Sequence, residues 1–162
     1  MSKTHLPPPP ALLDFLKPYD HEVQQLALAV RRFVIEHIPP MTELIVDASN
    51  AVAMGFTPTG RFKEAICHVA VQARHVNLGF NRGADLPDPN GVLKGTGKAI
   101  RHVTIERASD LQQPQLVAFL AAAVRRAHAG SAHAGIIIKS FSGKKRRPPA
   151  AKSKSGVAQP AD

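Results

Sequence analysis

Residues 64–80 read EAICHVAVQARHVNLGF, and apolar side chains occupy every second position on both sides of a short loop near Arg74. We consider a hairpin in which the numbers of two paired residues sum to 147, so that Cys67 lies opposite Phe80. In this register the apolar side chains all lie on one face of the hairpin. A shift of one residue would move them to the other face. The alternation therefore predicts two antiparallel strands in this register, around which the other elements are arranged.

Apolar residues elsewhere recur with the periods of helices and strands. After a predicted N-cap at Asp20, they follow at steps of three and four residues until Pro39 and Pro40 end the helix. A second helix is predicted to begin at Pro114 and to end near Gly130. Further elements are expected at 12–16 (a helical turn) and at 43–49, 51–56 and 99–105 (strands). Together they predict an α+β fold, an antiparallel β-sheet with N- and C-terminal helices packed on one face.

The charge divides the chain into unequal parts. The 162 residues carry a net charge of +9, and most of it lies after position 138 in a stretch rich in Ser, Gly, Pro and Ala. Such a composition buries too little apolar surface to fold. We therefore expect a Pro-rich flexible leader at 1–11, a folded domain at 12–130 and a basic, low-complexity, disordered tail at 131–162. The apolar run 136–138 is either a short strand or a sticky flanking segment.

The sequence argues against several classes of protein. One cysteine, Cys67, excludes an intramolecular disulfide, and its place on the core face of the hairpin predicts a buried thiol that is not a nucleophile. The eight histidines show no spacing typical of a metal site, so we expect neither metal nor cofactor. No apolar run has the length of a membrane span, and we expect a cytoplasmic protein without a membrane partner.

Polar and basic residues on the side of the sheet opposite the core form the candidate ligand site. Imidazole and amide groups on rigid strands, bordered by loop cations, would suit a shallow site for an anionic small molecule or protein. The alternative is the ordinary polar side of a half-exposed sheet. The candidate residues are His68, Asn77, Asn81, Arg82, Lys94, Lys98, Arg101 and His102.

Two other features suggest a polyanion partner. Residues 95–98, GTGK, resemble part of a phosphate loop, but Ala99 stands where Ser or Thr is required and a strand is expected to follow instead of a helix. The tail provides a cluster that would contact nucleic-acid phosphates without reading the sequence, unless it only solubilises the protein. The candidate nucleic-acid residues are Lys144, Lys145, Arg146, Arg147, Lys152 and Lys154.

Three segments resemble the YdhG-like family, a bacterial group of domains of unknown function. They are residues 76–89 (VNLGFNRGADLPDP), 93–98 (LKGTGK) and 101–105 (RHVTI), and the resemblance extends over about residues 20–128. It implies terminal helices on an antiparallel sheet. Another branch is labelled as frataxin-like iron chaperones, which bind iron through an acidic ridge. The corresponding candidates here would be Asp20, Glu22, Glu36, Glu43 and Asp47.

These observations give three expectations for function. The first is a non-enzymatic binding module for an anionic ligand or partner in the region between Arg82 and His102. The second is a nucleic-acid-associated protein that binds non-specifically through its basic tail. The third is a frataxin-like iron chaperone, which only the family resemblance implies.

Overall fold

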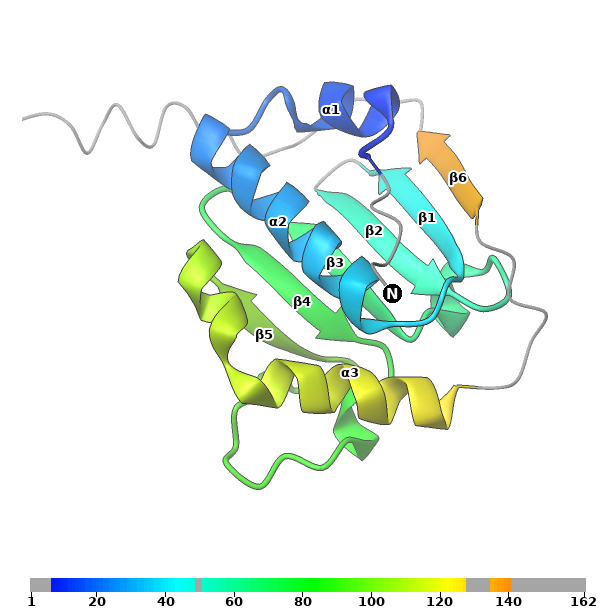
Figure 1. Ribbon diagram of the computed structural model, residues 1–162, viewed down its shortest axis with the longest axis vertical. Helices are drawn as coiled ribbons and strands as arrows, with labels where there is room; N and C mark the ends of the chain where they lie inside the picture. Colours follow the sequence, from blue (N-terminus) through cyan, green and yellow to red (C-terminus); the bar gives the residue numbers. More distant parts are fainter. Residues whose placement is uncertain (1–6, 49–50, 128–134, 141–162) are drawn as a thin grey trace, which may run out of the picture.

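The structure is a computed structural model that describes residues 7–48, 51–127 and 135–140. Within these ranges the chain forms three α-helices and one six-stranded sheet (Figure 1). The main elements are α1 (Pro10–Leu16), α2 (His21–His37), β1 (Thr42–Asp47), β2 (Val52–Thr57), β3 (Cys67–Val71), β4 (Val76–Phe80), β5 (Arg101–Ile105), α3 (Pro114–Arg126) and β6 (Gly135–Ser140). Three short 3-10 turns are η1 (Phe62–Glu64), η2 (Gly83–Asp85) and η3 (Ala108–Gln112).

The strands lie in the order β5-β4-β3-β2-β1-β6, with the three helices against one face of the sheet (Figure 1). This confirms the predicted α+β fold. Neighbouring strands from β1 to β5 are antiparallel, as expected, whereas β6 pairs with β1 in parallel and makes the sheet mixed. Part of the expected tail is therefore a strand, because residues 135–140 pair with the free edge of β1.

The hairpin of β3 and β4 has the predicted register. Cys67 pairs with Phe80, Val69 with Leu78, and Val71 with Val76. All six side chains are fully buried on the face that the helices cover. The prediction of a buried thiol is confirmed, since Cys67 has no exposed surface and its pKa is strongly raised by burial.

Both long helices begin and end close to the predicted positions. Asp20 is the N-cap of α2, although its carbonyl, and not its side chain, accepts a hydrogen bond, from the backbone N–H of Gln24 at 2.9 Å. α2 ends at His37, before the two prolines. Pro114 occupies the first turn of α3 as expected, and the helix ends at Arg126; the predicted end near Gly130 lies outside the described residues.

A buried ion pair joins α2 to β1. Arg31 Nε lies 2.8 Å from Glu43 Oε2, and Arg31 Nη2 lies 2.8 Å from Glu43 Oε1, so the guanidinium binds the carboxylate with two parallel hydrogen bonds. The two side chains are 3% and 4% exposed. Their charges compensate each other away from water, and the pair fixes the position of the helix against the edge of the antiparallel sheet.

The N-terminal boundary differs slightly from the prediction. α1 begins at Pro10, so the last two residues of the expected leader belong to the folded part. Proline suits the first turn of a helix because its missing N–H has no partner there. Among the described residues, no helix combines the length and the apolar character needed to cross a membrane.

Candidate anion-binding pocket

A pocket of about 340 Å³ opens at the end of the sheet where β2 and β4 finish and β3 begins. Three segments that are distant in the sequence form most of its walls: the β2–β3 connection, the end of β4 with η2, and the last turn of α3; Ala99, just before β5, completes them. The lining residues are Pro58, Thr59, Lys63, Glu64, Ala65, Ile66, Phe80, Asn81, Arg82, Leu86, Ala99, Ala123, Arg126 and Ala127.

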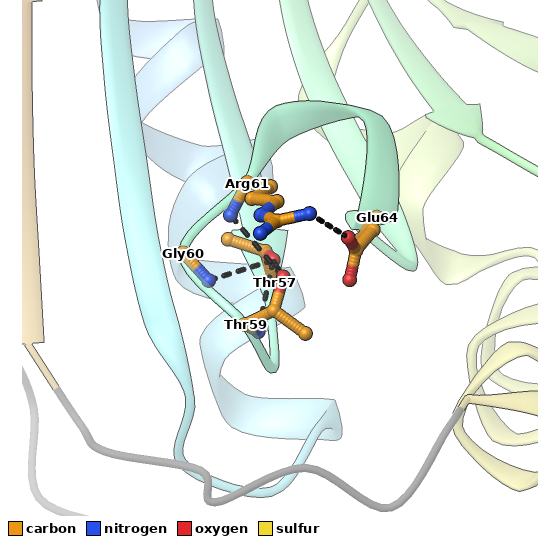
Figure 2. Close-up of polar contacts among 5 residues, drawn as sticks. All are labelled: Thr57, Thr59, Gly60, Arg61 and Glu64. Carbon is orange, nitrogen blue, oxygen red and sulfur yellow. Dashed lines mark hydrogen bonds and ion pairs between the residues drawn. The ribbon is translucent and has the colours of Figure 1, made fainter.

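Local hydrogen bonds shape the β2–β3 wall (Figure 2). The buried hydroxyl of Thr57 accepts hydrogen bonds from the backbone N–H of Thr59 at 3.2 Å and of Gly60 at 3.1 Å. Gly60 has φ +88°, a conformation that favours glycine, so the chain can turn sharply here. After the turn, the guanidinium of Arg61 lies 3.4 Å from the carboxylate of Glu64. This arrangement places Lys63 and Glu64 at the pocket.

The floor of the pocket is apolar. Ile66 and Leu86 are almost fully buried, and Phe80 has no exposed surface although it lines the pocket. The ring of Phe80 also packs edge-to-face against Phe119 of α3, with 5.7 Å between centroids. A ligand in the pocket would therefore rest on the outer layer of the hydrophobic core, where it can bury apolar surface.

Basic side chains surround this floor. Lys63, Arg82 and Arg126 are exposed and line the pocket from three different segments. Glu64 is the one acidic lining residue, and Arg61 is its ion-pair partner. Arg82 has a neighbouring acid, but its Nε lies 3.9 Å from Asp85 Oδ2, too far for a hydrogen bond. The lining is therefore positively charged, with cations that can reach a bound anion.

Asn81 connects the pocket to the outer face of the sheet. Its amide nitrogen donates a hydrogen bond to the carbonyl of Phe62 at 3.1 Å, and its amide oxygen accepts one from His68 Nδ1 at 2.8 Å. The imidazole of His68 lies over Gly79, where an added Cβ would overlap with the ring. The glycine thus leaves room for the His68 ring beside β4, and the hydrogen bond with Asn81 holds the ring at Nδ1.

The two histidines of the outer face have lowered pKa values. The pKa of His68 lies below its ordinary 6.5 chiefly because of burial, aided by the positive charge that His102 can carry; the hydrogen bond with Asn81 acts in the opposite direction. The pKa of His102 is lowered by burial and by the charges of Lys94 and His75. Both imidazoles are therefore neutral near pH 7, and neither adds a cation to the outer face.

This environment predicts a loss of stability in acid. Unfolded chains bind a proton at His68 with the ordinary pKa of 6.5, whereas the folded protein binds it only at lower pH. The contribution of neutral His68 to the free energy of unfolding is therefore fully present above pH 6.5. It is lost as the pH falls from 6.5 towards the lower pKa of the folded state. Urea unfolding at about pH 8 and pH 5.5 should show a smaller acid-induced decrease for His68→Gln than for the wild type.

The matched control for this measurement is His21→Gln, which removes an exposed imidazole at the start of α2. It shows how the loss of an exposed imidazole by itself affects the measurement. An equal pH dependence in His68→Gln and the wild type would show that the folded protein does not resist protonation of His68.

The structure divides the eight predicted ligand residues between several places. Asn81 and Arg82 line the pocket. His68, Asn77 and His102 lie on the outer face, half-buried and alternating with fully buried core residues. There, Asn77 accepts a hydrogen bond from the hydroxyl of Thr104 at 3.3 Å. Asn81 links these two groups through its hydrogen bond with His68.

The remaining predicted residues are Lys94 and Lys98, in the connection before β5, and Arg101, the first residue of β5. Lys94 and His102 exchange two backbone hydrogen bonds of 2.8 Å, which attach this connection to the edge of β5. Arg101 Nη1 donates to the carbonyls of residues 97 and 100, both at 2.7 Å, so this guanidinium stabilises the loop. Lys98 is exposed. The six candidate nucleic-acid residues all lie outside the described residues.

The sequence prediction missed two of the three pocket cations. Arg126 lies in the last turn of α3, where positive charge is common because it offsets the helix dipole, so the sequence offered no reason to expect a ligand there. Lys63 lies in the short turn η1. Only the folded chain brings positions 63, 82 and 126 together, and no local pattern signals this.

The acidic residues that the family resemblance suggested for iron do not gather into a site. Glu43 is buried against Arg31, and Asp47 is also buried. Glu36 pairs with Arg32 at 2.9 Å on the surface of α2. Among the described residues, no group of three or more His, Cys, Asp or Glu side chains could hold a metal ion.

Comparison with known proteins adds no assignment. The chain matches no family model, no curated protein and no solved structure. The resemblance to the YdhG-like family therefore stays a prediction.

Proposed function

We propose that this protein is a non-enzymatic binding module and that its ligand is a small anion held in the pocket at the end of the sheet. One observation carries the proposal. Lys63, Arg82 and Arg126 come from three separate parts of the chain and meet around a single apolar floor. A ligand with an acidic group and an apolar body would match both features.

The size of the pocket supports a small molecule as the ligand. A volume of about 340 Å³ is near the lower end of the roughly 300–1,000 Å³ found for small-molecule sites. Two of the three cations are arginines, whose planar guanidinium groups can bind a carboxylate or a phosphate through two parallel hydrogen bonds. We therefore propose a compact carboxylate or phosphate ester as the class of ligand.

The reactive groups near the pocket are already engaged, which supports binding rather than turnover. The Cys67 thiol is buried in the core with a raised pKa, so it does not provide a thiolate. Glu64 is paired with Arg61, and Asn81 bonds both Phe62 and His68. What the pocket offers to a ligand is a positively charged rim and an apolar surface.

A thermal-shift screen of carboxylated and phosphorylated metabolites tests the proposal, because a ligand that binds only the folded state raises the melting temperature. For a compound that does so, Lys63→Ala, Arg82→Ala and Arg126→Ala should each weaken binding about tenfold, the effect of losing one hydrogen bond to a charged group. Calorimetric titration would measure the affinities.

The control is Arg74→Ala, which removes an exposed arginine from the β3–β4 turn at the opposite end of the hairpin. It lowers the net charge by the same amount and should leave the affinity unchanged. If ligand binding survives in all three pocket variants, or if Arg74→Ala weakens it equally, the ligand does not bind in this pocket.

A further inference from the structure

β6 forms one edge of the sheet and pairs with β1 alone among the described strands (Figure 1). Its three isoleucines, Ile136, Ile137 and Ile138, are 39%, 41% and 41% exposed. An edge strand with apolar side chains presents unpaired N–H and C=O groups beside an apolar surface, and another strand can add to it. This edge has the properties of an interaction surface.

The opposite edge of the sheet differs from it. At β5, the backbone of His102 is already paired with Lys94 through two hydrogen bonds of 2.8 Å. The connection between η2 and β5 thus covers part of this edge and shortens the stretch available for pairing. β6 is consequently the edge on which a further strand would find continuous backbone groups.

We propose that a second copy of this chain occupies the edge, with the two β6 strands antiparallel around a two-fold axis at Ile137. In this register Ile137 lies opposite its own counterpart, and Ile136 lies opposite Ile138. Lys139 lies opposite Gly135, so the two lysines do not face each other. The strand is therefore complementary to itself in both shape and charge, as a two-fold interface requires.

Other two-fold registers are less favourable. With the axis at Ile138, Lys139 would lie opposite Ile137, and Ser140 opposite Ile136. With the axis at Ile136, Gly135 would face Ile137, and Ile138 would lie beyond the start of the partner's strand. The axis at Ile137 alone pairs all three isoleucines with isoleucines, and cross-strand apolar pairs of this kind stabilise a sheet.

The resulting dimer would join the two sheets edge to edge. The pairing of β6 with β1 sets Ile136 beside Glu43 and Ile138 beside Ile45, so both isoleucines lie on the face that carries the helices. Because the contact consists mainly of one short strand from each copy, its area is small. We expect a reversible dimer with a dissociation constant in the micromolar range.

Two double variants of the full-length chain test the register by sedimentation equilibrium at low salt. In I136K/I138K, each lysine would face a lysine of the partner. In I136K/I138D, each lysine would face an aspartate. Both variants lose the same two isoleucines and differ only in the residue at position 138, so the loss of apolar surface does not enter the comparison. We expect I136K/I138D to dimerise about tenfold more tightly than I136K/I138K, since two opposed pairs change from repulsive to attractive.

Mixing gives a second test. I136K/I138K combined with I136D/I138D should form a heterodimer more readily than either variant forms a homodimer. A wild-type chain that stays monomeric at every accessible concentration would overturn the proposal, and so would equal affinities of I136K/I138K and I136K/I138D. Circular dichroism should show the same folded spectrum for all variants, because the replaced side chains lie at an exposed edge.

Discussion

Replacing Arg31 with alanine should lower the free energy of unfolding by about 3–5 kcal/mol. The substitution leaves the Glu43 carboxylate buried, 4% exposed, without the guanidinium that binds it through two contacts of 2.8 Å. Removing one partner of a buried pair is costly because the remaining charge has lost its hydration and gained nothing in exchange. Glu43→Ala should also be destabilising, since it removes the carboxylate that accepts both of these hydrogen bonds from Arg31.

Urea unfolding would measure both changes, and Arg32→Ala is the matched control. Arg32 lies next to Arg31 on α2 and pairs with Glu36 at 2.9 Å, but both side chains are exposed, so this loss should cost less than about 1 kcal/mol. The double variant Arg31→Met/Glu43→Leu should lose less than Arg31→Ala, because the buried Glu43 carboxylate is removed together with its partner. Equal costs for Arg31→Ala and Arg32→Ala would contradict the buried position of the pair.

Phe80→Ala should also be strongly destabilising, by about 3–5 kcal/mol. Phe80 has no exposed surface, its ring packs edge-to-face on Phe119 with centroids 5.7 Å apart, and it pairs across the hairpin with Cys67. Truncation would leave a cavity between β4 and α3 that the surrounding elements cannot fill. Phe80→Leu keeps most of the volume and should cost about 1.5 kcal/mol or less.

The control for Phe80 is Val117→Ala, an apolar truncation on the exposed side of α3. It should change the free energy of unfolding by less than about 0.5 kcal/mol. Urea unfolding of the three variants gives the comparison. If Phe80→Ala cost no more than Val117→Ala, then Phe80 would not belong to the core, and the apolar floor of the pocket would not exist as described.

The hairpin shows which part of the fold the sequence can predict. Its alternation has a period of two residues, and only one register places Cys67, Val69 and Val71 on the same face as their partners. The helices were similarly predictable from their apolar period. β6 was not, because its pairing depends on a free edge of β1, which residues far earlier in the chain create. From the sequence alone, the apolar run 136–138 was compatible with a short strand and also with a sticky flanking segment.

The site was less predictable than the fold. The sequence singled out Arg82 and Asn81 because they stand in a distinctive loop, but it placed them at the border of the outer face that carries His68 and His102. The pocket depends on Lys63 and Arg126, which meet Arg82 only after the sheet and α3 have packed together. For the same reason, no local pattern indicates that Arg31 and Glu43, twelve positions apart, form a buried pair.

An amide chemical-shift titration with the ligand identified by thermal shift tests the central claim most directly. If the anion binds in the pocket, the largest changes should occur at Ala65, Ile66, Arg82 and Ala127, which line it from three segments. The amides of Asn77 and Thr104, on the outer face, should change little. Changes concentrated at Asn77, His102 and Thr104, with the pocket amides unaffected, would place the ligand on the outer face of the sheet and contradict the account.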